Sequence, residues 1–293
     1  MSIVAPRARF ELPLPGRAPL TLGARTLVMA VVNVTPDSFS DGGTSLDPER
    51  ALAHALELEA EGADLLDVGA ESTRPGSAGV DEAEELARIV PVLDRLAKAV
   101  RIPISVDTTK AAVAERALGA GACLVNDVSA LGYNRDLGAI VARHGAALVL
   151  MHMRGRPRDM YREARYDDVA ADVARELSDA VARALAAGVD PARLVLDPGL
   201  GFAKQPRHSY AALAGLDRLA ALGRPLLVGP SRKSFLADAA GGAPPTGRDW
   251  ATAGAVAAAV LGGAHIVRVH RVAGLADTVR AADAVRAAAE ERA

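Results

Sequence analysis

Cysteine and aromatic residues are scarce in this chain of 293 residues. Cys123 is the only cysteine, and only 3% of the residues are aromatic. A single cysteine excludes disulfide bonds within the chain and metal sites built from several thiolates, and it is compatible with a reducing compartment. Because Cys123 lies inside an apolar run, we expect a small buried hydrophobic side chain rather than a nucleophile.

An excess of charge of either sign is also missing. The chain has 34 Lys and Arg against 36 Asp and Glu, which gives a formal net charge of −2, and the basic residues are scattered. This balance argues against a protein that binds nucleic acid or a membrane surface. An anionic substrate would therefore have to be held by a local cluster of positive groups.

No segment has the pattern of a signal peptide or a membrane span. The first residues, MSIVAPRARFELPLPG, lack a charged start followed by an apolar stretch. The most apolar window, 251–267, is rich in Ala and Gly and shorter than the roughly 20 strongly apolar residues of a span. We expect a cytoplasmic protein in which this window forms a buried helix, a turn and a strand.

What the chain does contain is a series of eight short apolar runs, each followed by a loop and a helix-like stretch. The runs are LVMAVVN, ADLLDVGAE, IPISVDT, ACLVNDVS, ALVLMHM, RLVLDPG, PLLVGPS and HIVRVH. Eight such units fit an α/β fold, the (β/α)₈ or TIM barrel, in which catalytic groups come from the C-terminal ends of the strands. The residues at those ends are Asn33, Asp67, Asp107, Asn126, His152, Asp197, Ser231 and His270.

Helical periodicity and an N-terminal segment complete the predicted fold. Apolar residues at helical spacing predict helices over 47–61, 81–99, 109–119, 135–144, 167–187, 207–222, 249–261 and 275–290. Alternation and turn residues in 1–26 predict a β-hairpin that could plug the N-terminal end of the barrel. No linker divides the chain, so we expect one domain over 1–293. The rival fold, an open doubly wound sheet, would show a Gly-rich phosphate turn after its first strand, and this chain does not.

The last apolar run carries Arg268 and His270 two positions apart. Side chains alternate along a strand, so these two share one face and Val267 and Val269 take the other. The valines should face the helices, which turns Arg268 and His270 toward the barrel mouth. A buried arginine needs an anionic partner. That partner is either an aspartate of a neighbouring strand or a bound phosphate or diphosphate, and the residues alone favour neither.

Polar residues at other strand ends could surround a flat heterocycle. Asp107, Asn126 and Asp197 end three strands and Lys233 follows a fourth, so that together they offer hydrogen-bond acceptors and donors. The alternative is a polar plug in which Lys233 pairs with Asp107 or Asp197, but four such residues on separate strands favour a ligand site. Asn33 could offer an oxygen to Mg²⁺ that is held mainly by substrate phosphates and water.

Other candidates are less specific. Phe39 lies in a long loop and could cover an aromatic substrate, and Phe202 could stack on a flat ring or simply pack under its loop. His152 has no further ligand at metal-like spacing, so we expect a satisfied structural histidine. Asp67 is compatible with supporting its own loop or with touching substrate.

Eight segments carry a family resemblance from about Leu27 to Val272. They are NVTPDSFSDGG (33–43), DVGAESTRPG (67–76), ISVDTTK (104–110), NDVSAL (126–131), LMHMRGRP (150–157), DPGLGFAK (197–204), GPSRKSFL (229–236) and GAHIVRVH (263–270). They resemble those of the dihydropteroate synthases, pterin-binding TIM-barrel enzymes of folate biosynthesis. The first segment together with SRKSF is highly specific, although GFAK replaces the more usual GFGK.

The resemblance implies a transferase that joins 6-hydroxymethyl-7,8-dihydropterin diphosphate to 4-aminobenzoate and releases diphosphate. It implies departure of the diphosphate before the amine attacks, Mg²⁺ as a cofactor and a homodimer. Two alternatives are a catalytically silent pterin-binding paralogue and a pterin-dependent methyltransferase. The first would need a broken motif, which we do not find, and the second has no need of a site for diphosphate.

The resemblance also assigns roles to residues. The catalytic residues would be Lys233, Arg268, His270 and Asp107. The pterin would be held by Asp107, Asn126, Asp197, Lys233, Met151 and Phe202. The aminobenzoate would be held by Phe39, Thr73, Pro75, Arg232 and Ser234. The diphosphate would be held by Asn33, Arg74, Arg268 and His270, with Asn33 also on the metal.

Overall fold

Eight parallel strands form the centre of the molecule. The computed structural model describes residues 4–35, 47–72, 77 and 79–291. The strands are β3 (Leu27–Asn33), β4 (Leu65–Gly69), β5 (Ile104–Asp107), β6 (Leu124–Asp127), β7 (Ala147–Met151), β8 (Leu194–Asp197), β9 (Leu227–Val228) and β10 (Ile266–Val269). They are ordered β8-β7-β6-β5-β4-β3-β10-β9, and a parallel bridge between Leu196 and Leu226 joins the two edges. The predicted TIM barrel is confirmed.

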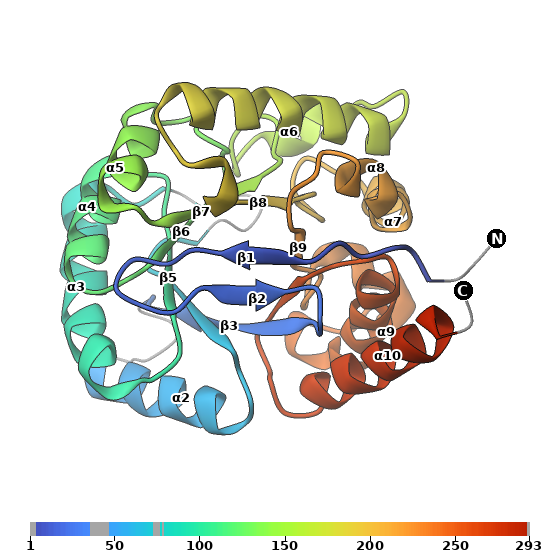
Figure 1. Ribbon diagram of the computed structural model, residues 1–293, viewed down its shortest axis with the longest axis horizontal. Coiled ribbons are helices and arrows are strands. Elements are labelled where there is room, and N and C mark those ends of the chain that lie inside the picture. Colours follow the sequence, from blue (N-terminus) through green and yellow to red (C-terminus); the bar gives the residue numbers. More distant parts are fainter. Residues whose placement is uncertain (1–3, 36–46, 73–76, 78, 292–293) are drawn as a thin grey trace.

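Helices surround this barrel (Figure 1). They are α2 (Pro48–Ala60), α3 (Glu82–Ala99), α4 (Ala111–Gly119), α5 (Asp136–His144), α6 (Val169–Ala186), α7 (Pro206–Ala214), α8 (Leu216–Ala220), α9 (Asp249–Leu261) and α10 (Leu275–Glu290). Asp47, Asp81 and Asp168 cap α2, α3 and α6, and each accepts hydrogen bonds from N–H groups of the first turn. Such caps satisfy donors that a helix leaves unpaired at its start, which is why these helices begin where they do.

One predicted helix is in fact two. The stretch 207–222 is divided at Gly215, which separates α7 from α8. A Cβ atom at Gly215 would lie only 2.6 Å from the Cβ of Ala170 on α6, so the turn between the two helices packs on α6 as only glycine permits. Leu213, Leu216 and Leu219 are all buried, so the apolar spacing continues across the break. For this reason the sequence pattern predicted a single helix.

Side chains along each strand alternate between two apolar cores. In β10, Val267 and Val269 belong to the core between barrel and helices, whereas Ile266 belongs to the barrel interior. Arg268 therefore points into the barrel, as the alternation predicted. Cys123 lies in the interior cluster as a buried free thiol, which agrees with the expected packing role.

A hairpin plugs the N-terminal end of the barrel, with its two strands lying across that end in Figure 1. Its strands β1 (Phe10–Leu12) and β2 (Leu20–Leu22) pair antiparallel. Leu12 and Leu22 are fully buried in the interior cluster, together with Leu27 and Leu65 from the starts of β3 and β4. Burying one such leucine stabilises a fold by about 1.5–3 kcal/mol. The hairpin is thus part of the core, and the polar strand ends lie at the opposite end.

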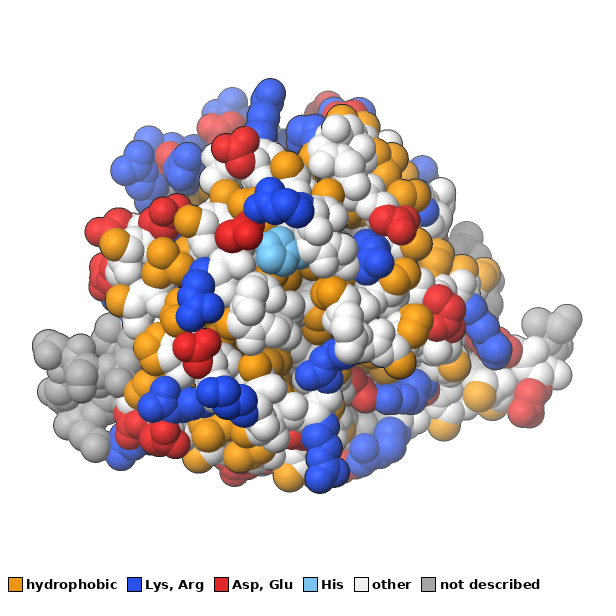
Figure 2. Space-filling view, turned by 60° about the vertical axis from the view of Figure 1, so that its left-hand side comes forward, with side chains coloured by type: hydrophobic (Ala, Val, Ile, Leu, Met, Phe, Trp, Pro, Cys, Tyr) orange, Lys and Arg blue, Asp and Glu red, His pale blue; other side chains and the backbone are white. Residues whose placement is uncertain are grey.

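The charged surface is mixed in sign, as the composition indicated. On the face that Figure 2 shows, Lys and Arg side chains lie among Asp and Glu side chains. Ion pairs join neighbouring helices, as between Arg116 of α4 and Asp94 of α3 and between Arg143 of α5 and Glu115 of α4. Within the described part of the chain, no helix is both long and apolar enough to cross a membrane.

Candidate active site

Arg268 on β10 is shared by two carboxylates at the open end of the barrel. Its Nε donates to Oδ2 of Asp67 on β4 at 2.6 Å, and its Nη2 donates to Oδ2 of Asp107 on β5 at 2.9 Å. Asn126 on β6 donates from Nδ2 to the same Asp67 oxygen at 2.9 Å. Of the two partners considered for Arg268, the structure contains aspartates, but they lie on β4 and β5, beyond the adjacent strand β3. The side chain also reaches the mouth, where a ligand could still contact the guanidinium.

Burial changes the ionisation of the carboxylates at the mouth. Burial raises the pKa of Asp107 to about 7, even though the Arg268 charge opposes the shift and Asp67 adds to it. Burial likewise raises the pKa of Asp197. A carboxyl group that titrates near neutrality can exchange a proton when a ligand binds, so Asp107 has the chemistry of a proton acceptor.

Two buried oxygens at the mouth lack a partner within the described chain. Oδ1 of Asp67 and Oδ1 of Asn126 make no hydrogen bond to any described group, although both residues are almost completely buried. An unpaired buried acceptor is costly unless a ligand or a water molecule donates to it. These oxygens therefore mark a place that suits the N–H groups of a bound heterocycle. The sequence left open whether Asp67 supports its own loop or touches substrate. The structure shows that it accepts hydrogen bonds from both Arg268 and Asn126 at the mouth.

Lys233 pairs with an aromatic ring rather than with a carboxylate. Its Nζ lies 4.4 Å from the ring centroid of the half-buried Phe202. Burial lowers the pKa of Lys233 to about 8, while Asp197 and Asp107 oppose that shift. A Cβ at Gly201 would lie 3.2 Å from Cδ of Lys233, so the glycine lets the lysine pass close to the backbone. The ammonium and the ring together form one wall of the mouth.

The loop between β8 and α7 supplies this wall and has an unusual backbone. Gly199, Gly201 and Ala203 all have positive φ, at 65°, 80° and 47°. Asp197 accepts a hydrogen bond from the N–H of Gly199 at 2.7 Å, and this bond fixes the start of the loop. Met151, at the end of β7, is buried beside Gly199. The glycines fit this conformation, whereas an alanine adopts it at a cost of roughly 1–2 kcal/mol.

A second region of the mouth is an open cavity of about 640 Å³. Its lining includes Asn33 from the end of β3, His270, Arg232 and Arg271 on one side, and His54, Glu57 and Glu61 of α2 and its C-terminal end on the other. His270 is held by Ser231, whose Oγ lies 3.1 Å from Nδ1 and accepts from the His270 N–H at 3.2 Å. The two arginines, the imidazole and the amide could contact a phosphate-type anion, whereas the two glutamates would repel it. The diphosphate roles of Asn33 and His270 therefore stay predictions.

The loop after β9 carries the remaining predicted residues. Arg232 has a φ of 58°, and its guanidinium donates from Nε to Oδ1 of Asp249 on α9 at 3.1 Å. Ser234 is exposed, and its Oγ lies 3.3 Å from the Tyr161 hydroxyl. Arg232 thus shapes the loop, while Ser234 faces the loop that carries Tyr161. The predicted residues Phe39, Thr73, Arg74 and Pro75 lie outside the described residues.

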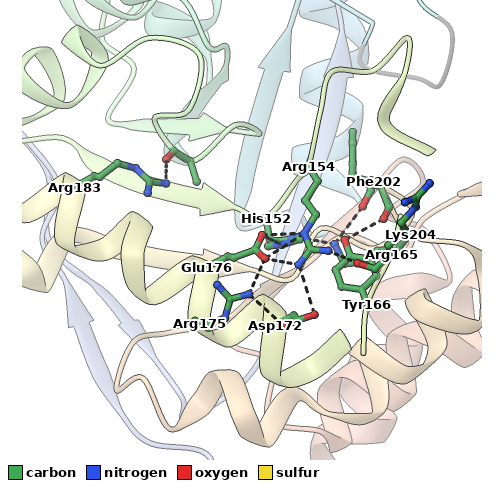
Figure 3. A network of polar contacts seen from close by, with 12 residues as sticks. His152, Arg154, Arg165, Tyr166, Asp172, Arg175, Glu176, Arg183, Phe202 and Lys204 are labelled. Carbon is green, nitrogen blue, oxygen red and sulfur yellow. Dashed lines mark hydrogen bonds and ion pairs between the residues drawn. The ribbon is translucent and has the colours of Figure 1, made fainter. Parts of the chain in front are cut away.

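His152 follows β7, but its side chain faces away from the mouth, so it does not join the other strand-end residues there. Its contacts confirm the expected structural role. Its Nε2 lies 2.9 Å from Oε2 of Glu176 on α6, and its Nδ1 lies 2.8 Å from Nζ of Lys204 (Figure 3). Lys204 is 1% exposed, and burial lowers its pKa well below the usual value. Sequence reasoning missed this network. The one sequence signal for the network was Lys204 itself, a lysine in the glycine-rich segment DPGLGFAK.

The described residues of the mouth could hold Mg²⁺ only when a phosphate ligand supplies further oxygen atoms to the ion. Among the described residues, no group of three or more His, Cys, Asp or Glu side chains could hold a metal ion. Asn33 is the oxygen donor that the sequence predicted, and it lines the same cavity as His270. Mg²⁺ commonly uses one or two protein oxygens and takes the rest from substrate phosphates and water, so this donor set is compatible with it.

The chain is similar to known proteins over most of its length. A family model described as pterin binding enzyme matches residues 29–270. The dihydropteroate synthase of Mycobacterium leprae is 49% identical over 259 residues, which are 86% of this chain and 91% of that protein. The structure of the Xanthomonas albilineans dihydropteroate synthase with 4-aminobenzoic acid has a TM-score of 0.87 at 45% identity and covers 94% of this chain and 99% of its own. The Yersinia pestis enzyme in a sulfonamide drug complex has a TM-score of 0.88 at 41% identity and covers 95% and 100%.

The positive φ of Ala203 predicts an unusual response to glycine. In an ordinary helix, a buried Ala→Gly change costs about 1 kcal/mol of backbone freedom and further stability from the lost methyl burial. At Ala203 we expect the relief of backbone strain to cancel these losses, so Ala203→Gly should change the free energy of unfolding by less than about 0.5 kcal/mol. The control is Ala212→Gly, at a fully buried position in α7. Denaturant unfolding of both variants measures the difference, and equal losses would contradict the strain argument.

Proposed function

The chain belongs to the pterin-binding enzyme family and acts as its dihydropteroate synthase members do, and we propose how the residues at its barrel mouth carry out that reaction. The enzyme is a transferase of folate biosynthesis. It joins the dihydropterin of 6-hydroxymethyl-7,8-dihydropterin diphosphate to 4-aminobenzoate, forms 7,8-dihydropteroate and releases diphosphate. The observation that carries the assignment of residues is the shared Arg268 beside two unpaired buried acceptors.

The pterin lies among the polar residues inside the barrel mouth. Asp107, Asn126 and Asp197 accept hydrogen bonds from its N–H edge, and Lys233 donates to its oxygen or ring nitrogen. Phe202 and Met151 form apolar walls on either side of the flat ring. A flat heterocycle suits this slot because the polar groups come from separate strands and point toward one space. The unpaired Asn126 oxygen supports this placement.

The diphosphate lies toward the cavity lined by Asn33 and His270. Arg268 touches both regions, since it is bonded to the aspartates of the pterin slot and lies two positions before His270. Arg74 is expected to add a further cation to this anion site. Positive groups placed where charge develops on a leaving diphosphate stabilise the transition state more than the ground state.

Mg²⁺ is the proposed cofactor, and Asn33 would hold it together with the diphosphate and water. When bound, the ion neutralises charge on the leaving diphosphate. The protein residues of this site have separate tasks. His270, oriented by Ser231, donates a hydrogen bond to a diphosphate oxygen, and Arg268 holds the diphosphate next to the pterin.

The chemical step is a substitution at the exocyclic carbon of the pterin. The bond from this carbon to the diphosphate oxygen breaks first, and its electron pair leaves with the diphosphate. The cation that remains is delocalised into the ring, and the amine of 4-aminobenzoate then attacks the carbon and loses a proton. No nucleophilic side chain is needed in this scheme. The catalytic residues are therefore those that hold charge, namely Lys233, Arg268, His270 and Asp107.

The 4-aminobenzoate binds at the rim of the mouth. Ser234 and the loop shaped by Arg232 form one side of its pocket. Phe39, Thr73 and Pro75, in the segments after β3 and β4, are expected to form the other side. The Xanthomonas albilineans structure with 4-aminobenzoic acid, which covers 94% of this chain, supports a pocket for that acid.

A homodimer is the proposed assembly, with the Ala-rich helices α9 and α10 at the contact. These two helices pack against each other, and Trp250 on α9 is 91% exposed, which is unusual for the largest aromatic side chain. We expect analytical ultracentrifugation to give a mass of twice the 30.2 kDa chain. Trp250→Glu should shift the mass toward that of one chain. A wild-type mass of a single chain at micromolar concentration would contradict the assembly.

The activity itself gives the direct test of the proposed residues. With Mg²⁺, dihydropterin diphosphate and 4-aminobenzoate, the purified chain should form dihydropteroate and release diphosphate. Lys233→Ala and Arg268→Ala should each lower kcat/KM by about 100-fold or more, the usual effect of removing one electrostatic contact to a transition state. The matched control is Arg218→Ala on α8, which lies outside the proposed site. Pterin binding without turnover in the wild type would instead favour the silent paralogue or the methyltransferase.

The ionisation of Asp107 and Lys233 predicts a pH optimum for pterin binding. The pKa of Asp107 is about 7, so below pH 7 its carboxyl group must lose a proton before it can accept from the pterin. The affinity should fall by up to about tenfold per pH unit below pH 7. The pKa of Lys233 is about 8, so the affinity should fall again above pH 8 as the ammonium is lost.

Calorimetric titration of 6-hydroxymethyl-7,8-dihydropterin between pH 5.5 and 9 measures the fall of affinity on the acid side and on the alkaline side. In the control, Asp107→Asn should abolish the fall below pH 7 and keep the fall above pH 8. An affinity that stays constant or rises as the pH falls below 7 would show that Asp107 does not accept from the ligand.

A further inference from the structure

The β8–α7 loop has a strained backbone that side-chain contacts must hold in place. Ala203 has a φ of 47° and is fully buried between Phe202 and Lys204. Residues in such conformations persist only where the surrounding structure holds them, and they often lie at functional sites. Since Phe202 is the neighbour of Ala203, whatever holds this backbone also sets the position of the Phe202 ring.

Two side chains hold the carbonyl groups of this loop. Nζ of Lys204 donates to the carbonyl oxygen of Phe202 at 3.2 Å. The hydroxyl of Tyr166 donates to the carbonyl oxygen of Ala203 at 3.0 Å. Lys204 belongs to the loop itself, whereas Tyr166 lies in the segment before α6, and Nζ of Lys204 is 5.8 Å from the centroid of the Tyr166 ring (Figure 3).

The position of Lys204 is set in turn by His152. The Glu176 carboxylate has only acceptors, because its His152 and Arg154 partners outweigh burial and lower its pKa, so Nε2 of His152 carries the hydrogen and donates it. Nδ1 of His152 then accepts from Nζ of Lys204. Burial and the Lys204 charge lower the pKa of His152 to about 4, so the ring stays neutral and keeps this tautomer. Neither hydrogen-bond partner of Lys204 is a carboxylate, and burial without such a partner is costly for a lysine.

The same network reaches Tyr166. Arg154 donates from Nε to both carboxylate oxygens of Glu176 at 3.1 Å, and its guanidinium carbon lies 4.1 Å from the centroid of the Tyr166 ring. Glu176 therefore connects the two side chains that hold the loop, through His152 on one path and Arg154 on the other. We name Lys204, Tyr166, His152 and Glu176 the loop clamp.

We propose that Lys204 is a positioning residue of the pterin slot, which acts by holding the Phe202 carbonyl and, with Tyr166, keeps the Phe202 ring beneath the Lys233 ammonium. The inference rests on the proposed function, because Phe202 walls the slot only if the pterin binds there. The loop also meets Lys233 directly, since a Cβ at Gly201 would lie 3.2 Å from Cδ of Lys233. A displaced loop would therefore disturb the apolar wall and the ammonium together.

The test compares two variants that each remove a buried basic side chain that donates to a backbone carbonyl oxygen. Lys204→Met removes the clamp ammonium and keeps a side chain of similar length. Arg286→Met is the control, because Arg286 is also 1% exposed and donates from Nη1 to the carbonyls of Val260 and Leu261, remote from the mouth. Both variants should unfold at lower temperature than the wild type, so a purely structural effect is matched between them.

The probe is 6-hydroxymethyl-7,8-dihydropterin, titrated calorimetrically at a temperature where all variants are folded. Lys204→Met should raise its Kd about tenfold, and Arg286→Met should leave it within about twofold of the wild type. In turnover assays, Lys204→Met should raise KM for the pterin diphosphate much more than it changes kcat. Tyr166→Phe, a milder change that removes only the hydroxyl, should raise the Kd about threefold and serves if Lys204→Met does not fold.

The outcomes separate the inference from the function beneath it. A wild-type Kd in Lys204→Met and Tyr166→Phe would overturn the inference alone. An equal rise of Kd in Lys204→Met and Arg286→Met would do the same, since it would mark a global effect. Failure of the wild-type chain to bind the pterin would overturn the proposed function, and the role of Lys204 with it.

Discussion

The ion pair that Arg268 makes with Asp67 and Asp107 is the constraint on which the barrel mouth depends. Burying an isolated charge costs several kcal/mol, and here one cation offsets two carboxylates whose own repulsion would otherwise be large. Asn126 completes the arrangement by donating to Asp67. The three charged residues come from β4, β5 and β10, so their pairing reaches across β3 and joins segments that are far apart in the sequence.

Two polar systems lie on opposite sides of that wall and meet at one loop. Met151 and His152 are neighbours in sequence, yet Met151 lines the mouth and His152 faces α6, because side chains alternate along an extended strand. The polar system inside the barrel includes Lys233, and the system outside it includes Lys204. Both lysines contact Phe202, one through its ring and the other through its carbonyl group. The shape of the ligand site thus depends on packing outside the barrel.

Much of this architecture could be predicted from periodicity. The eight apolar runs are the eight strands, and the direction of Arg268 followed from the apolar partners on either side of it. The division of one predicted helix at Gly215 could not be predicted, because its cause is a contact with Ala170 on another helix. The same is true of Lys233, which could have paired with an aspartate but lies over Phe202. Phe39 and the residues 73–75 stay predictions.

The sequence by itself determined the order of strands and helices, the polar residues at the strand ends and, through its motifs, the family. These depend on local backbone period and on residue types at fixed spacing, which are present in the chain before it folds. Only the tertiary structure decided which partners those residues have. Arg268 and Asp67 are 201 positions apart, and Lys204 and His152 are 52 apart. Contacts over such separations depend on barrel closure and on the packing of loops against helices, and no local pattern encodes them.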